Sequence, residues 1–219
     1  MIRRASAKMP GFFLEDEMYQ TLVVIDEFLD FADALRQKAL GSPYPELEGE
    51  QYFPGRNSAE ALTIQGLDQL VSNIVGEQLV PAEGTSHGKF RLAMEGDTGA
   101  GGVHIDKCDW SGILYLTDDK YCQGGTDFFR NKALNSDKAP LTQNDLKAMG
   151  LSSFDAFWHD HLLKHGTQPD KWELTTHIPM RFNRLILFRP WLFHNAGSSF
   201  GKTPEQARLI YPLFYRRAT

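Results

Sequence analysis

From Phe90 to Tyr215 the chain consists mainly of short segments that are apolar or alternate between apolar and polar residues, with turn-forming residues between them. Seven of these segments read FRLAM, GVHID, GILYLT, TDFFR, THIPM, RLILFR and ARLIYPLFY. Segments of this length and spacing are typical of an all-β sandwich or barrel. We therefore predict a mainly β fold with flanking helices, in the form of a jelly roll.

Residues 1–85 are expected to add an N-terminal strand and supporting helices. The β-branched run Thr21–Ile25 predicts a strand, and Asp30 is a candidate N-cap for a short helix that Gly41 would end. A second helix is predicted by apolar residues that recur at intervals of three and four, namely Leu67, Leu70, Val71, Ile74 and Val75. We expect the 219 residues to form a single domain, with residues 86–219 as its β core.

Residues 139–166 interrupt the predicted strands with a helical pattern. Thr142–Asp145 and Ser152–Asp155 resemble capping boxes with Asp in place of the usual Glu, and Gly150 and Gly166 would end the two helices. An insertion of this size is often a lid or an interaction surface, but it can equally cover an exposed sheet edge. Because it lies between the segments that carry the candidate metal ligands described below, we predict that it lies near the mouth of their site.

Charge and cysteine content restrict the classes of partner and of compartment. The net charge of −5 and the pI of about 5.8 give no attraction to nucleic acid or to anionic membranes, so we expect neither as a partner. Cys108 and Cys122 are too few for a disulfide framework or a zinc ribbon, and we expect reduced thiols in a cytoplasmic protein. The N-terminus, MIRRASAKMPGFF, lacks the apolar region of a signal peptide, and no apolar run reaches the roughly 18 residues of a membrane span. The oligomeric state is left open.

The segment GGVHIDKCDWSGILYLTDD contains two potential metal ligands, His104 and Asp106. Side chains at positions i and i+2 of a strand project from the same face, so the imidazole and the carboxylate would point together. A third ligand is offered by His194 in WLFHNAG, just after the predicted strand Leu185–Phe188. Two imidazoles and one carboxylate make the facial triad that is typical of non-haem Fe(II) oxygenases.

Other readings of the histidines are weaker. A His-x-Asp can occur by chance in a chain with seven histidines, and its context beside predicted strands is what strengthens it. His161 and His165 lie four residues apart on a predicted helix, but they lack the glutamate of the HExxH zinc motif. We interpret that pair as a solvated helix face.

An Fe(II) centre of this kind needs an electron source to activate O2, and the commonest source is a bound 2-oxo acid. The far carboxylate of that acid must be held by a cation, preferably an arginine. Arg208 opens the apolar segment ARLIYPLFY, whereas Lys202 lies in the loop FGKTPEQ. An arginine that points inward from a strand needs a partner, which favours Arg208, although Arg208 could instead pair with a protein acid or face solvent.

These segments resemble the 2-oxoglutarate- and Fe(II)-dependent dioxygenases, in the prolyl-4-hydroxylase-like branch. HID, LYLT, GGTDFF, LFRPWLFHNAG and ARLIYPLFY follow the family order, and TLVVIDEFLDFADALRQKAL and YFPGR resemble the opening of small bacterial members of unassigned substrate. The resemblance implies a double-stranded β-helix in which His104, Asp106 and His194 bind the iron. It also implies that Arg208 and Tyr115 bind 2-oxoglutarate. The interval from His194 to Arg208 is longer than usual, which keeps Lys202 as an alternative.

The resemblance implies an oxygenase that hydroxylates a small molecule or an amino-acid or peptidyl substrate while 2-oxoglutarate becomes succinate and CO2. Asp106 favours hydroxylation over halogenation, because related halogenases lack a carboxylate at this position. No side-chain acid or base is expected beyond the metal ligands. Two alternatives stay open: a cupin-like oxygenase that does not use 2-oxoglutarate, and a non-catalytic metal-binding module. Trp110, Arg56 and the helix 154–161 could line the pocket, although core packing or surface is their more usual role.

Overall fold

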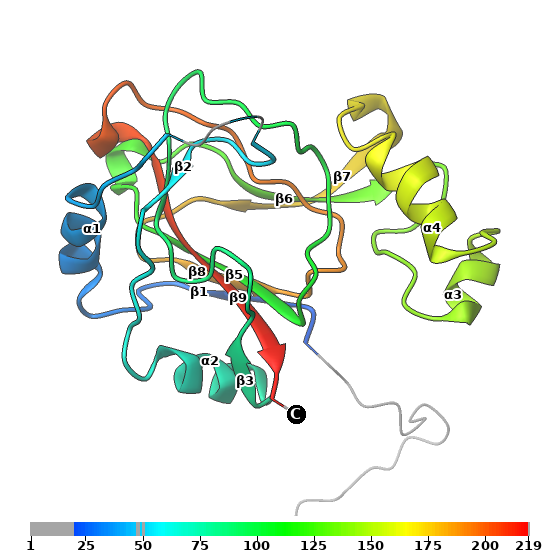
Figure 1. Ribbon diagram of the computed structural model, residues 1–219, viewed down its shortest axis with the longest axis horizontal. Coiled ribbons are helices and arrows are strands. Elements are labelled where there is room, and N and C mark those ends of the chain that lie inside the picture. The colour runs from blue at the N-terminus through cyan, green and yellow to red at the C-terminus, as the bar shows by residue number, and fades with distance from the viewer. Residues whose placement is uncertain (1–19, 47–48, 50, 219) are drawn as a thin grey trace, which may run out of the picture.

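The computed structural model describes residues 20–46, 49 and 51–218. The N-terminal residues 1–19, which we expect not to form a signal peptide, lie outside the described part. The prediction of a mainly β fold with flanking helices is confirmed, because the described residues form two antiparallel sheets and a smaller number of helices (Figure 1).

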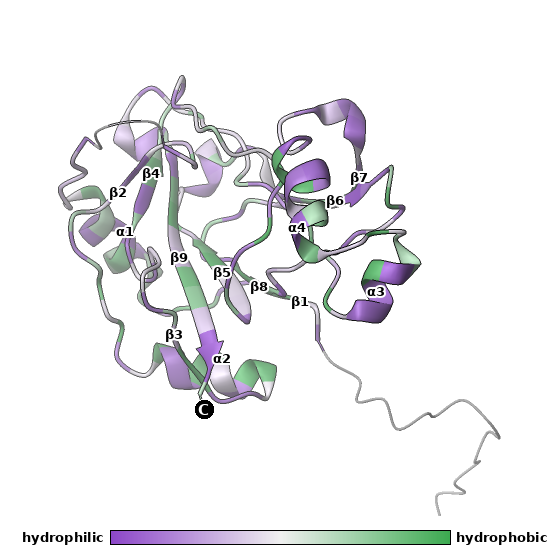
Figure 2. Cartoon of the chain, turned by 45° about the vertical axis from the view of Figure 1, so that its right-hand side comes forward, coloured by the Kyte–Doolittle hydropathy of each residue, from purple (hydrophilic) through white to green (hydrophobic). Residues whose placement is uncertain are grey.

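The larger sheet has seven strands in the order β1-β8-β5-β9-β4-β2, and β3 pairs with β9 beside this path. The seven strands are β1 (Leu22–Ile25), β2 (Arg56–Asn57), β3 (Leu79–Pro81), β4 (Arg91–Ala93), β5 (Trp110–Tyr115), β8 (Leu185–Phe188) and β9 (Arg208–Arg217). The long strand β9 is central, since it pairs with β5, β4 and β3. Figure 2 shows β9 as hydrophobic along most of its length and hydrophilic at its C-terminal end.

Alternation along the strands gives the larger sheet two different faces. The outer face packs against α1 (Ala32–Leu40) and α2 (Leu67–Val75) in one buried core. On β9 this face carries Leu209, Tyr211, Leu213 and Tyr215. The intervening residues of β9 line a cavity on the inner face, and they are Arg208, Ile210, Pro212 and Phe214. The alternation along β9 therefore places Arg208 on the side of the sheet that faces the cavity.

A second layer faces the inner side of the larger sheet. It contains β6 (Gly125–Asn131) and β7 (Trp172–Pro179), which form a two-stranded sheet. Isolated bridges extend this layer, because His194 pairs with Phe128 of β6 on one side and with His104 on the other. Phe128 packs with Phe188 and Ile210 of the larger sheet, and this contact joins the two layers.

The helical insertion consists of α3 (Gln143–Ala148), α4 (Phe154–Phe157) and a π-helical turn η2 (Trp158–Leu163). It lies beside β6 and β7 (Figure 1), and Phe157 and Leu162 pack against Trp172 and Phe193. Its end reaches the metal-ligand segment, where the Val103 amide donates to the Gly166 carbonyl at 2.8 Å. A Cβ on Gly102 would lie 2.0 Å from the Gly166 oxygen, so glycine at position 102 permits this contact. Short 3-10 turns, η1 (Asp119–Tyr121), η3 (Pro169–Lys171) and η4 (Pro204–Gln206), complete the described chain.

Three local predictions were wrong in detail. Helix α1 begins after Phe31 without a side-chain cap, so Asp30 is not its N-cap. The Thr142–Asp145 capping box is present, but α4 is capped by the Ser153 hydroxyl, which accepts from the Ala156 amide, and not by Ser152. The segment GVHID forms an isolated bridge at His104 rather than a strand. Within the described residues no helix is long and apolar enough to cross a membrane.

Candidate metal centre

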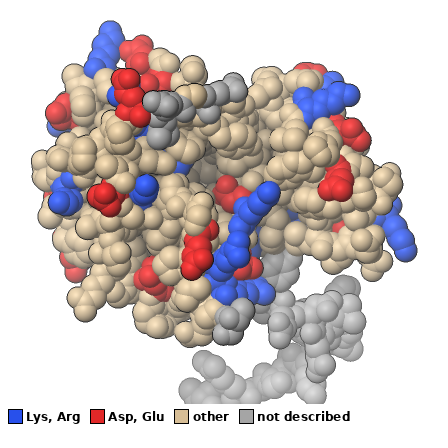
Figure 3. Space-filling view, viewed as in Figure 1, with Lys and Arg blue, Asp and Glu red and all other residues tan. Residues whose placement is uncertain are grey.

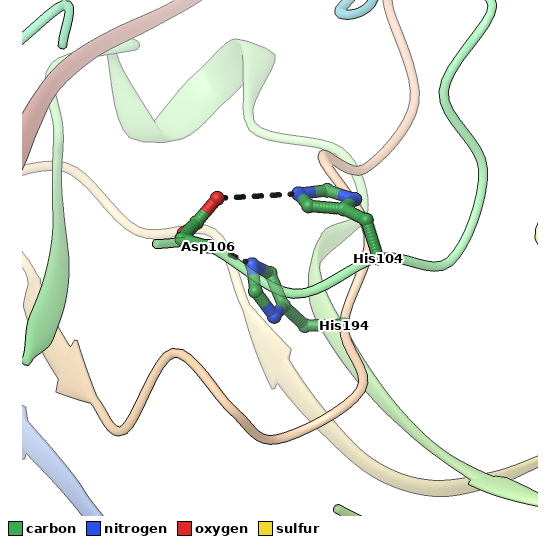
Figure 4. Close-up of side chains that lie close together, drawn as sticks. All are labelled: His104, Asp106 and His194. Atoms are coloured by element: carbon green, nitrogen blue, oxygen red, sulfur yellow. Dashed lines mark ion pairs between the residues drawn. The ribbon is translucent and has the colours of Figure 1, made fainter. Parts of the chain in front are cut away.

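His104, Asp106 and His194 converge in the structure (Figure 4). One ligand atom from each lies within 4.8 Å of the others. The His104 Nε2 is 3.8 Å from Asp106 Oδ1, and the His194 Nε2 is 3.3 Å from Asp106 Oδ2. In the described part of the chain, no other group of three His, Cys, Asp or Glu residues is close enough to hold a metal ion.

Backbone pairing explains why two histidines 90 residues apart meet. The His104 amide donates to the His194 carbonyl at 2.8 Å, and the His194 amide donates back to the His104 carbonyl at 3.1 Å. Residues that exchange both hydrogen bonds in an antiparallel bridge present their side chains on the same face. The two rings accordingly lie with their centroids 4.4 Å apart. The convergence therefore comes from a bridge between distant segments.

Hydrogen bonds to backbone carbonyls orient both rings. The Nδ1 of His104 lies 2.9 Å from the Gly102 oxygen, and the Nδ1 of His194 lies 2.8 Å from the Leu192 oxygen. A carbonyl can only accept, so each Nδ1 carries the proton and each Nε2 keeps a free lone pair. Metal-binding histidines are commonly held in this way, because the hydrogen bond of the nitrogen that faces away from the metal fixes both the tautomer and the ring orientation.

His104 and Asp106 have the protonation states that metal ligands require. Burial lowers the pKa of His104 to about 4, and the neighbouring His194 acts in the same direction. Burial alone would raise the pKa of Asp106, but its contacts with His194 and His104 and the hydrogen bond from Ser111 lower it well below its usual value. The Ser111 hydroxyl, on β5, also donates to Asp106 Oδ2 at 2.5 Å. A neutral imidazole and an ionised carboxylate are therefore available at neutral pH.

The three side chains face a cavity of about 400 Å³ on the inner side of the larger sheet. Figure 3 shows a recess between the body of the molecule and the part that carries α3 and α4. Trp158 and Leu163 of the insertion line this cavity, which agrees with the predicted position at the mouth of the site. His161 and His165 are half-buried, their ring centroids lie 5.9 Å apart, and the Nδ1 atom of each is buried, so the interpretation of this pair as a solvated helix face was wrong. Trp110 is fully buried in the outer core, and Arg56 forms an ion pair with Glu46.

Arg208 lines the inner end of the same cavity and is 3% exposed. Neither of its terminal nitrogens has a hydrogen-bond partner among the described residues. Burial lowers the pKa of Arg208, and the adjacent Tyr115 hydroxyl raises it. Gly197, with φ of +75°, passes so close that a Cβ would lie 3.1 Å from the guanidinium carbon. A buried cation without an acceptor indicates a site for an anion.

Two neighbours of Arg208 form a polar pair beside it. The Tyr115 hydroxyl and the Thr126 hydroxyl are 2.7 Å apart, and both side chains are buried. Thr126 was not singled out from the sequence, although it follows the two glycines of the GGTDFF segment. Lys202, the alternative cation, is exposed and does not line the cavity.

Arg91 of β4 also lines the cavity and was missed in the sequence. It stands opposite Ile210 of β9 in the register, on the same face as Arg208. An arginine within the short apolar segment FRLAM was the available signal. The criterion applied to Arg208, an inward cation on an apolar strand, applies equally to this residue.

The sequence of this chain matches the model of one protein family. Residues 14–215 match the model of DUF6445, which is described as a family of unknown function. The chain belongs to this family. A comparison with curated proteins gives no match.

Comparison with solved structures finds enzymes that use 2-oxoglutarate. The carbocyclase SnoK from nogalamycin biosynthesis, named as non-heme and alpha-ketoglutarate-dependent, is 12% identical with a TM-score of 0.48, over 91% of this chain and 81% of that one. The epimerase SnoN from the same biosynthesis is 16% identical with a TM-score of 0.49, over 91% and 77%. HygX from Streptomyces hygroscopicus, with nickel, 2-oxoglutarate and hygromycin B bound, is 13% identical with a TM-score of 0.49, over 90% and 83%. With TM-scores below 0.5, these similarities identify neither the fold nor the reaction of this chain.

Proposed function

We propose that this DUF6445 protein is an Fe(II)- and 2-oxoglutarate-dependent oxygenase that hydroxylates a small molecule or an amino-acid or peptidyl substrate. The observation that carries the proposal is one cavity with two features. A His-Asp-His cluster faces it, and a buried arginine without an acceptor lines its inner end. We further propose that the two facing layers are an irregular double-stranded β-helix, in one domain, with the cluster between the layers.

The donor set fits a divalent transition metal. Two imidazole Nε2 atoms and one carboxylate, all on one side of the centre, leave coordination positions open for other ligands. Both rings are already oriented by carbonyls, and the carboxylate is already oriented by Ser111, so little reorganisation is needed on binding. His104, Asp106 and His194 would hold the metal.

The inner end of the cavity fits the distal carboxylate of 2-oxoglutarate. The guanidinium of Arg208 offers two terminal nitrogens without an acceptor among the described residues, in the fork that suits a carboxylate. The Tyr115–Thr126 pair lies beside it and can rotate a hydroxyl toward the same oxygen. Lys202 is exposed and outside the cavity, which favours Arg208 as the anchor.

When bound, Fe(II) and 2-oxoglutarate couple the oxidation of the substrate by O2 to the conversion of the co-substrate to succinate and CO2. The chain itself contributes orientation and exclusion of water. Arg208 would hold one end of the co-substrate, and His104, Asp106 and His194 would hold the metal to which its other end binds. Phe188 packs edge-on against the His194 ring, with the ring centroids 4.7 Å apart, and keeps this side apolar. No side-chain acid or base is required, and Asp106 occupies the position that a halide would need.

The test is O2-dependent formation of succinate from 2-oxoglutarate by the purified protein loaded anaerobically with Fe(II). Wild type should form succinate, at least slowly without a substrate, and Asp106→Ala should form none. Glu77→Gln is the control, because Glu77 is an acidic residue that pairs with Arg189 and Arg217 outside the cluster. It should keep the activity.

Two other results would favour the alternatives. Metal-dependent O2 consumption without loss of 2-oxoglutarate would favour a cupin-like oxygenase. Metal binding with neither O2 consumption nor 2-oxoglutarate binding would favour a non-catalytic module. Either result would refute the proposed function.

A further inference from the structure

Arg91 is a second cation of the cavity for which the proposed reaction has no use. Its side chain is held at three points by neutral groups. The Nε donates to Asn57 Oδ1 at 2.8 Å, and Nη2 donates to Ser86 Oγ at 3.0 Å. The guanidinium carbon lies 3.5 Å from the centroid of the Phe53 ring. These contacts orient the guanidinium without neutralising its charge.

No carboxylate pairs with Arg91 among the described residues, and its Nη1 has no protein acceptor there. Burial lowers the pKa of Arg91 to about 10, Asp106 raises it, and the charge of Arg208 lowers it further. The group therefore stays protonated near neutral pH. Arg91 is half-buried, and its oriented guanidinium is not neutralised, so Nη1 is available to an anionic ligand.

Charge balance in the cavity indicates one missing anion. Among the described residues that line it, Asp106 is the only acidic one, while Arg91 and Arg208 are both cationic. A divalent metal adds two positive charges, and 2-oxoglutarate brings two negative ones. One positive charge then remains at Arg91. Lys107 is exposed at the rim with its Nζ 5.2 Å from the centroid of the Trp158 ring, so solvent screens its charge and it is left out of this balance.

We propose that Arg91 binds a carboxylate of the substrate, so that the substrate class is a small monoanionic acid with an apolar body. This inference rests on the proposed function, because it assumes that 2-oxoglutarate occupies Arg208. The wall near Arg91 and the mouth is aromatic, with Tyr52, Phe53 and Trp158. The cavity volume of about 400 Å³ suits a small molecule or one side chain. Arg91 is thus the specificity-determining residue for charge.

The test uses three probes that share one body and differ in charge: 3-phenylpropionate, 3-phenylpropionamide and 3-phenylpropylamine. Binding is measured by calorimetry to protein loaded with Ni(II) and 2-oxoglutarate, which is inert to O2. Wild type should bind the acid about 10- to 100-fold more tightly than the amide, as expected for a charge-assisted pair, and the amine should bind most weakly.

Arg91→Gln should abolish this preference and leave 2-oxoglutarate binding within about twofold of wild type. Arg91→Lys should keep part of the preference, because it retains the charge but loses the fork. Arg56→Gln is the matched control, on the strand that pairs with β4, and should behave as wild type. A purely structural role of Arg91 would lower binding of all three probes alike and would not alter the ratio of acid to amide.

The inference is overturned if wild type binds the amide as tightly as the acid, or if Arg91→Gln keeps the wild-type preference. It is also overturned if Arg91→Gln loses 2-oxoglutarate binding while Arg208→Met retains it, because Arg91 would then be the co-substrate anchor. The same titration with Ni(II) alone separates the two proposals. The protein could prefer the acid over the amide in a way that depends on Arg91 and yet fail to bind 2-oxoglutarate. That result would support this inference and refute the proposed function.

Discussion

Replacing Arg208 by Met should stabilise the ligand-free protein while it removes co-substrate binding. Arg208 is 3% exposed, and both terminal nitrogens lack an acceptor among the described residues. Leaving buried donors unsatisfied costs about 1–3 kcal/mol, more when the group is charged. Methionine fills a similar volume without that cost, so the free energy of unfolding should rise by about 1–3 kcal/mol. For a chain of this size the melting temperature should rise by roughly 2–12 °C.

The same substitution removes the proposed partner of the distal carboxylate. Breaking a buried charged pair costs about 2–5 kcal/mol, so 2-oxoglutarate should bind roughly 30- to 5,000-fold more weakly. Metal affinity should change little, because Arg208 is not a member of the His-Asp-His cluster. Arg208→Lys should recover only part of the binding, since a point charge cannot form the fork.

The assay is thermal unfolding of wild type and variant with Ni(II), each with and without 2-oxoglutarate. A ligand present at about 100 times its Kd stabilises the folded state by about 2.7 kcal/mol, so wild type should show a clear shift and Arg208→Met at most about a third of it. Lys202→Met is the control and should shift as wild type does. The reasoning is refuted if Arg208→Met melts lower than wild type without ligand and still responds to 2-oxoglutarate. A response lost only in Lys202→Met would move the anchor to that residue.

Three further outcomes are expected. Thr126→Val removes the partner of the Tyr115 hydroxyl and should weaken 2-oxoglutarate binding about 3- to 10-fold, with no change in Ni(II) affinity by calorimetry. Trp158→Ala removes a wall of the cavity and should weaken 3-phenylpropionate binding about 3- to 10-fold, with Ni(II) affinity unchanged. An equal loss of 3-phenylpropionate affinity and Ni(II) affinity would contradict a role limited to substrate access. Burial lowers the pKa of His104 from 6.5 to about 4, so between these values the unfolded chain binds a proton that the folded, metal-free protein does not. Its free energy of unfolding should therefore fall by roughly 1–3 kcal/mol as the pH falls through this range, and His104→Gln should flatten the profile in chemical denaturation.

Much of the fold follows from periodicity. The alternation in GILYLT and ARLIYPLFY predicts two strands with one face in a core and one face elsewhere, as β5 and β9 have. The interval of three and four predicts α2. Cap positions were less predictable because several polar residues compete near a helix start. Ser152 and Ser153 are adjacent, and tertiary packing of Phe157 decides which of them caps α4.

The three candidate ligands were predictable as residues, but the reason they meet was not. We expected His104 and Asp106 to share the face of a strand, whereas an isolated bridge between His104 and His194 brings the rings together. Pairing between segments 90 residues apart depends on register, which a single sequence does not reveal. Arg91 was missed for the same reason. Only its pairing opposite Ile210 shows that it shares a face with Arg208.

The central claim is that one cavity binds a metal at the three ligands and 2-oxoglutarate between that metal and Arg208. A crystal structure of the protein grown anaerobically with Ni(II) and 2-oxoglutarate, with anomalous scattering to locate the metal, tests both parts at once. The account predicts a single metal peak about 2.0–2.2 Å from the Nε2 atoms of His104 and His194 and from an Asp106 oxygen. It also predicts the distal carboxylate of 2-oxoglutarate on the Arg208 guanidinium. A metal peak away from these ligands, or a distal carboxylate bound by Lys202 or Arg91 instead, would contradict it.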